Sequence, residues 1–182
     1  MRRASTRAFT LRPVRPREVQ AVRWLIQLYI YDLGGARWDV ERNGAFAPAS
    51  WHRRFWRGRG RHLFVLRVRG RLAGFVLVRD RAHFAGRAAR EIGEFFVLQK
   101  YRRQGVGTRA ALAVFTRFPG RWELAELSWN VGAQRFWRRV IRRVAVGGVS
   151  ERRRRHGDLA FVVQHFETPM PRVRSGERRR SA

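Results

Sequence analysis

The clearest chemical pattern lies in residues 102–108, the run Arg-Arg-Gln-Gly-Val-Gly-Thr. An apolar strand precedes it and a helical pattern follows, so both glycines stand at the start of a helix. The first N–H groups of a helix have no partner within it, and the helix dipole favours an anion there. Gly105 and Gly107 lack a Cβ, which lets a phosphate approach the backbone. The run predicts a pyrophosphate cradle, but it is not a Walker A loop or a complete dinucleotide fingerprint, and such glycines also occur in plain turns.

Carboxylates form the second pattern. The chain has 13 acidic residues among 182, and five of them fall in two short segments. One segment is an apolar strand with Glu91 and Glu94, where burial should raise the pKa of a carboxylate and suit it to act as a base near neutral pH. The other segment is the end of the first helix and its following loop, with Tyr29, Tyr31, Asp32, Asp39 and Glu41. These acids predict an anionic pocket for an amine; the alternative is ordinary charge on a helix face and in a loop.

Hydrophobic periodicity indicates the elements that position these residues. Residues 9–14 alternate as a strand, and apolar residues recur at helical spacing from there to Leu33, where two glycines end the helix. A polar loop and a short basic helix with Trp51, Phe55 and Trp56 should follow. Further strands are expected at 62–69, 72–79, 91–98 and 121–128, helices at 107–118 and from an N-cap at Asn130, and a closing pair of strands at 144–149 and 159–166 around the run 152–156.

This order predicts an α/β (α+β) fold, with one mixed and mostly antiparallel sheet and helices on both faces. We expect a single domain over residues 1–167 and a disordered basic tail over 168–182. No apolar run approaches the roughly 18 residues that a membrane span needs, so we expect a cytoplasmic protein. The five histidines are scattered and there is no cysteine. We therefore expect neither a metal site nor a thiol nucleophile.

The formal net charge of +28 is unusual, and all but one of the 41 basic residues are arginine. One interpretation is a polyanionic partner such as RNA or DNA. The other is a genome-wide coding bias, which explains arginine over lysine but not the shortage of acids. The runs 152–155 and 178–180 favour a polyanion, although neither has interleaved aromatic residues for base stacking.

Two motifs and the element order carry a family resemblance. The strand ending in Phe95-Phe-Val is followed by Arg102-x-x-Gly105-x-Gly107, and the next helix begins with Asn130 and contains Ala133, Phe136 and Trp137. The chain thereby resembles the GNAT superfamily of N-acetyltransferases. It is most similar to uncharacterised acetyltransferases that share the run Gln-Leu-Tyr-Ile-Tyr-Asp-Leu, here residues 27–33.

The resemblance implies acetyl-CoA as co-substrate, no metal, and direct acetyl transfer to a primary amine in a ternary complex. It implies cofactor contacts for the strand end, the glycine run and the helix cap: Phe95, Phe96, Val97, Arg102, Arg103, Gln104, Gly105, Val106, Gly107, Thr108 and Asn130. Asn130 can also be a simple cap. Acceptor binding is assigned to Tyr29, Tyr31 and Asp32.

For the catalytic base we predict Glu94, which lies nearest the expected thioester, with Glu91 as the second candidate. The alternative for Glu94 is a structural carboxylate paired with an arginine. A regular strand would place Glu91 on the face of Phe95 and Val97, and Glu94 on the opposite face; a bulge would change this.

Other positions fit the remaining catalytic roles less well. On the next strand, some family members have a Glu five residues before the Asn, but that position is Ala125 here. Glu126 is one residue away and should face the other side of the sheet, and Glu123 has the right parity but lies further along the strand. Many members have a Tyr acid where this chain has Trp137. Trp cannot donate a proton in this role, so water or a group such as Ser128 would have to do so.

The alternative function is a non-catalytic basic protein of the same fold that binds RNA or another polyanion. Non-specific attraction of nucleic acid is expected either way, because the net charge is +28. A homodimer is a further open expectation, and no membrane partner is expected.

Overall fold

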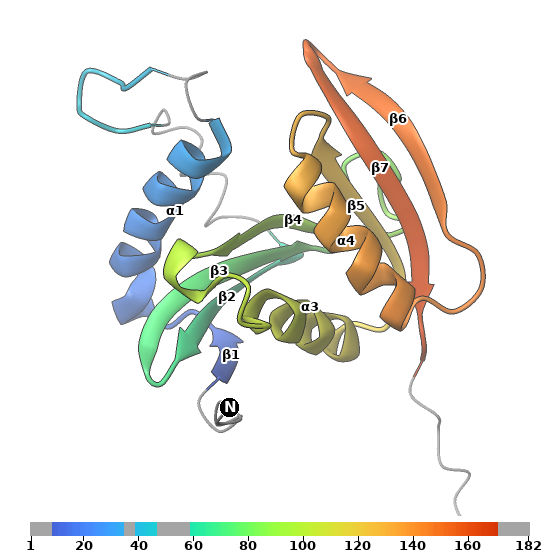
Figure 1. Cartoon of the computed structure of the whole chain (residues 1–182), viewed down its shortest axis with the longest axis horizontal. Coiled ribbons are helices and arrows are strands. Elements are labelled where there is room, and N and C mark those ends of the chain that lie inside the picture. The colour runs from blue at the N-terminus through green and yellow to red at the C-terminus, as the bar shows by residue number, and fades with distance from the viewer. Residues whose placement is uncertain (1–8, 35–38, 47–58, 171–182) are drawn as a thin grey trace, which may run out of the picture.

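The computed structural model describes residues 9–34, 39–46 and 59–170. Within them the strands form one seven-stranded sheet in the order β1-β2-β3-β4-β5-β7-β6 (Figure 1). All neighbouring strands are antiparallel except β4 and β5, which are parallel. The strands are β1 (Phe9–Pro13), β2 (Arg61–Val68), β3 (Arg71–Arg79), β4 (Arg90–Val97), β5 (Gly120–Leu127), β6 (Ser150–His156) and β7 (Leu159–Thr168).

Helices cover both faces of the sheet. On one face, α1 (Val19–Gly34) buries Val22, Ile26 and Ile30, which recur every four residues and form one stripe against β2 and β3. On the other face lie α3 (Val106–Arg117) and α4 (Val131–Val144), whose larger apolar cluster includes Phe115 and Trp137. Two short 3₁₀ turns, η2 (Pro16–Glu18) and η4 (Gln99–Tyr101), precede α1 and α3. None of the described helices has the length and apolarity needed to cross a membrane.

β4 and β5 are the least extensively paired neighbours in the sheet. In the described chain, these eight-residue strands pair at two positions, Arg90 with Trp122 and Glu91 with Glu123. Beyond Glu91 the strands diverge, as Figure 1 shows, so β4 has no strand partner on the side that faces β5.

The predicted fold class is confirmed, but the last strands differ from expectation. Residues 144–149 are not a strand: Val144 ends α4 and a loop follows. The arginine run itself forms β6, because β6 is an edge strand with every residue exposed and needs no apolar face. β7 runs to Thr168, which is buried and bonds to Gly120, so the strand passes the predicted domain end at 167. The basic helix expected near Trp51 and the tail beyond 170 lie outside the described residues.

Candidate active site

The N-terminus of α3 has the features of an anion site. Gly105 is its N-cap, with φ of 76°, a left-handed conformation that favours glycine. The first helical bond is donated by Arg109 N–H to the Gly105 carbonyl, at 3.0 Å. In the described part of the chain, the N–H groups of Val106, Gly107 and Thr108 donate to no acceptor. A Cβ on Gly105 would meet nothing within 4 Å, so the space beside this residue is open.

Gly107 lies beside two aromatic rings. A Cβ on this residue would lie 3.4 Å from the ring of Phe136 and 3.6 Å from that of Phe95. These are ordinary van der Waals distances, and they show that the Cβ direction of Gly107 faces α4 and β4. The Gly107 amide lies in the first turn of α3.

The Arg102 side chain points away from the α3 amides. Its guanidinium donates to the Asp32 carboxylate at 2.6 and 3.2 Å, and its Nε donates to the Val97 carbonyl at 2.7 Å. Gln99 also donates to Asp32, at 3.3 Å. These contacts join the end of α1 to the loop before α3. They occupy the carboxylate of Asp32, one of the three residues predicted for the acceptor, whereas Arg103 is exposed.

The start of α4 combines a cap with aromatic packing. Asn130 Oδ1 accepts a hydrogen bond from Ala133 N–H at 3.1 Å, so its predicted cap role is confirmed. Trp137 is buried, and its ring lies 5.0 Å from that of Phe95 and 4.8 Å from that of Phe136. Trp137 thus fills the core at the position where the resemblance would lead one to expect a tyrosine acid.

A bulge at Gly93 brings the two candidate bases to one face of the sheet. Leu77 pairs with Glu94, but the next β3 residue pairs with Ile92, so Gly93 is the extra residue. Glu91 pairs with Arg79 and therefore shares the α1 face with Glu94. The regular-strand expectation, which placed Glu91 with Phe95 and Val97, is wrong for this reason.

Glu94 is a half-buried carboxylate with one neutral partner. The Tyr29 hydroxyl donates to its Oε2 at 2.6 Å. Burial raises the pKa of Glu94 to about 7, against the opposing effects of the Tyr29 hydrogen bond and the nearby Arg79. The pKa of Tyr29 is itself well above its usual value, because of burial and the Glu94 charge. Tyr29 therefore stays protonated as a donor, while Glu94 can take up a proton near neutral pH.

Glu91 is less accessible than Glu94. Its side chain accepts a hydrogen bond from Arg79 Nη2 at 3.2 Å, and the residue is 3% exposed. Burial raises the pKa of Glu91 to about 7; Arg79 opposes this, and the charges of Glu123 and Glu94 add to it. Among the three predicted acceptor residues, Tyr29 is the one that contacts Glu94. Tyr31 is 59% exposed and packs on Phe46, with 5.1 Å between ring centres.

Two further carboxylates on β5 have different surroundings. Glu123 is fully buried and accepts from Phe84 N–H, from Ala85 N–H and from His165, at 2.7 to 3.0 Å, so it anchors the β3–β4 loop beside Glu91. Glu126 lies on the α4 side, where neither oxygen has a partner among the described residues. Burial raises its pKa to about 8. The alternation of β5 predicts that these two residues face opposite sides, but the loop contacts of Glu123 have no local sequence signal.

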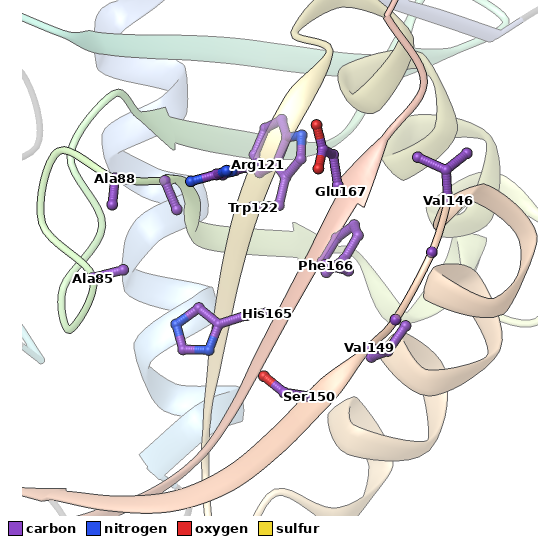
Figure 2. A pocket seen from close by; sticks show the side chains of 13 residues that line it. Ala85, Ala88, Arg121, Trp122, Val146, Val149, Ser150, His165, Phe166 and Glu167 are labelled. Carbon is purple, nitrogen blue, oxygen red and sulfur yellow. The ribbon is translucent and has the colours of Figure 1, made fainter.

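A cavity of about 590 Å³ lies elsewhere, between the start of β5, the end of β7 and the loop after α4 (Figure 2). Trp122, Val149, Phe166 and Glu167 are among its lining residues, which include neither Tyr29, Glu94 nor the start of α3. The described residues contain no group of three or more acidic or histidine side chains able to hold a metal ion. The candidate site is therefore the region around Glu94, the β4–β5 divergence and the α3 N-terminus.

Residues 27–141, well over half of the chain, match the acetyltransferase (GNAT) family, and the chain belongs to that family. Solved structures agree on the fold. A GCN5-related N-acetyltransferase from Kribbella flavida has a TM-score of 0.64 and 16% identity, covering 90% of this chain and 99% of that one. An acetyltransferase from Thermus thermophilus has a TM-score of 0.61 and 13% identity, over 88% and 97%. For yncA of Salmonella typhimurium, solved with its cofactor acetyl-CoA, the TM-score is 0.59 and the identity 13%, over 88% and 94%. No curated protein matches the chain.

Proposed function

We propose that this protein transfers the acetyl group of acetyl-CoA to a primary amine by direct attack in a ternary complex, with Glu94 as the base. The observation that carries the proposal is the Glu94 carboxylate, which has a pKa of about 7 and lies beside the point where β4 and β5 separate. Membership of the acetyltransferase family and the fold shared with yncA support acetyl-CoA as the donor.

The described residues suit two parts of acetyl-CoA, its pyrophosphate and its extended pantetheine arm. The amides of Val106, Gly107 and Thr108, with open space beside Gly105, suit a pyrophosphate. The β4 backbone at Phe95 and Phe96 lacks a strand partner on the β5 side, so its polar groups can pair with the amides of an extended arm. Asn130 uses Oδ1 for the α4 cap, which leaves its amide nitrogen to donate to that arm.

Acetyl-CoA supplies the acetyl group as a thioester, whose sulfur leaves as a thiol. The acceptor amine is an ammonium ion at neutral pH, and Glu94 removes one of its protons so that the nitrogen lone pair can attack. Formation of the C–N bond and loss of the C–S bond release a second nitrogen proton, which balances the charge of the sulfur. Tyr29 holds the Glu94 carboxylate in place and remains protonated throughout.

The donor site can be tested without knowing the acceptor. Thr108→Glu places a negative charge in the first turn of α3, where it should repel a pyrophosphate but favour the helix dipole. We expect the Kd for acetyl-CoA, measured by calorimetry, to rise at least tenfold (roughly 1.4 kcal/mol) while the melting temperature stays level or rises. Gln20→Glu is the matched control, since it adds the same charge to the first turn of α1.

The control should bind acetyl-CoA like the wild type. If Thr108→Glu also binds with unchanged affinity, the α3 N-terminus is not the pyrophosphate site. If the wild type binds no acetyl-CoA at all, the proposed function is wrong.

A further inference from the structure

The exposed side of α4 carries a line of arginines that faces β6. With 3.6 residues per turn, Arg135, Arg138 and Arg142 lie along one side of the helix, and all three are exposed. Arg138 donates to the Glu151 carboxylate of β6 at 2.6 and 2.9 Å. This contact shows that the line borders β6.

β6 contributes a second line beside the first. Residues two apart share a strand face, so Arg153 and Arg155 lie on the same side as Glu151. β6 runs opposite to α4 (Figure 1), so Arg153 and Arg155 extend from the Arg138–Glu151 contact toward the start of α4, while Arg142 extends toward its end. β6 is also the last strand of the described sheet, so the backbone groups on its outer edge are open to solvent. We call Arg135, Arg138, Arg142, Glu151, Arg153 and Arg155 the α4–β6 surface.

The α4–β6 surface has an excess of unpaired positive charge. Arg138 is paired with Glu151, but the other four arginines form no ion pair within the described residues. Elsewhere, the half-buried arginines Arg12, Arg67 and Arg79 have carboxylate partners. Exposed arginines without an ion pair also occur elsewhere in the described chain, Arg69 and Arg87 among them, but here four of them adjoin on one surface with a single acid.

We propose that the α4–β6 surface binds the phosphate backbone of a nucleic-acid duplex. Guanidinium groups pair bidentately with phosphates, and the free β6 N–H groups add donors. The surface contains no aromatic residue for stacking on bases, which favours a duplex, with one charge per roughly 1.7 Å, over a single strand. A second copy of the chain fits poorly, because it would bring arginines against arginines.

This site can coexist with the proposed transfer reaction and does not depend on it. Phe136 marks the side of α4 that faces Gly107 and the α3 N-terminus. Arg138 and Arg142 lie on the opposite side of the helix, about 160° and 120° away at 100° per residue. A bound duplex would therefore leave the start of α3 open.

The test measures binding of the full chain to 20-base-pair RNA and DNA duplexes by fluorescence anisotropy as salt is varied. Four substitutions are combined in one variant: Arg135→Gln, Arg142→Gln, Arg153→Gln and Arg155→Gln. Each lost phosphate contact removes about 0.9 from the log–log salt slope, so the slope should fall by about 3 to 4. The control combines Arg69→Gln, Arg71→Gln, Arg81→Gln and Arg87→Gln, which lie in the β2–β3 turn, at the start of β3 and in the β3–β4 loop, and which change the net charge equally.

The control variant should keep a slope within about 1 of the wild type. The proposal is overturned if both variants lower the slope equally, because binding would then follow net charge. It is also overturned if a single strand binds as tightly as the duplexes, or if the four substitutions change the oligomeric state rather than the salt slope. Unequal binding of the RNA and DNA duplexes would identify which of the two the phosphate surface prefers.

Discussion

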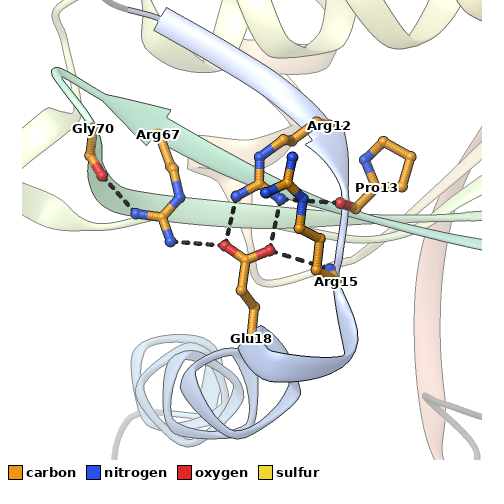
Figure 3. A network of polar contacts seen from close by, with 6 residues as sticks. All are labelled: Arg12, Pro13, Arg15, Glu18, Arg67 and Gly70. Carbon is orange, nitrogen blue, oxygen red and sulfur yellow. Dashed lines mark hydrogen bonds and ion pairs between the residues drawn. The ribbon is translucent and has the colours of Figure 1, made fainter.

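Glu18 and Glu94 are both shielded carboxylates, yet their surroundings are opposite. Figure 3 shows Glu18 surrounded by cations: Arg12 donates to both oxygens at 2.6 Å, Arg67 donates at 2.8 Å, and Arg15 N–H at 3.1 Å. These donors, and above all Arg12, hold the pKa of Glu18 well below its usual range. Glu94 has the neutral Tyr29 as its hydrogen-bond donor, and its pKa is raised to about 7.

The comparison separates a structural carboxylate from a reactive one. A carboxylate that accepts four charged or backbone hydrogen bonds has no reason to take up a proton near neutral pH, and its contacts join β1, β2 and η2. A carboxylate with one neutral donor retains basicity and a free oxygen for substrate. Burial alone does not distinguish the two, but the number and charge of the donors do.

The largest expected effect is on catalysis by Glu94→Gln, which keeps the size of the side chain and removes its basicity. The rate of thiol release, with the best amine from a screened panel, should fall by about a hundredfold or more. The Kd for acetyl-CoA should stay within about twofold, because Glu94 faces the acceptor side.

Glu91→Gln is the matched comparison for that variant. If Glu91→Gln abolishes the reaction and Glu94→Gln does not, then Glu91 is the base and Glu94 is the structural member of the pair. The wild-type kcat/KM should rise with pH and level off above about 7, since the base must be unprotonated.

The next effect is on stability, from Glu18→Gln. Loss of the charge-assisted bonds should lower the free energy of unfolding by about 2 kcal/mol at pH 7, measured in urea, with the acetylation rate unchanged. A depressed folded-state pKa stabilises above the unfolded-state pKa, and this contribution is lost as pH falls through the folded-state value. The difference between wild type and variant should therefore shrink in acid; a constant difference from pH 7 to pH 2 would contradict the ion-pair account.

The smallest effect should come from Tyr29→Phe. The hydroxyl lowers the Glu94 pKa, so its removal should move the acid limb of kcat/KM upward by about 1 pH unit. The plateau rate should change far less than in Glu94→Gln, because the base remains. A fall in rate at every pH without a shift of the limb would show that Tyr29 does not act through Glu94.

The features of the fold that depend on the local residue pattern could be predicted from the sequence. The 3.6-residue and two-residue periodicities located α1, α3, α4 and most strands, and Asn130 was recognised as a cap from residue type and position. Glu18 had a usable local signal that was missed, since Pro16 and Glu18 occupy the first and third positions of a helical turn, where a carboxylate can cap the backbone.

Contacts between distant residues could not be predicted in the same way. The Gly93 bulge decides which face Glu91 occupies, and it arises from pairing with β3 rather than from β4 itself. Arg102 and Asp32 are 70 residues apart, so the local sequence gave no indication that their side chains form an ion pair. The arginine strand β6 was missed because an edge strand exposed on both faces lacks the hydrophobic alternation on which strand prediction relies.

The pairing of β4 with β5 at Arg90 and Glu91 has a structural consequence. Strand pairing between the β1–β4 part and the β5–β7 part is confined to these two positions, and the two parts are held together further by the Glu123 bonds to Phe84 and Ala85 and by a shared apolar core. Glu94 and the β4 end lie in one part, while Glu123 lies in the other and Asn130 follows β5. The gap between β4 and β5 beyond Glu91 is thus set by side-chain packing and by these loop bonds, and not by a β-ladder.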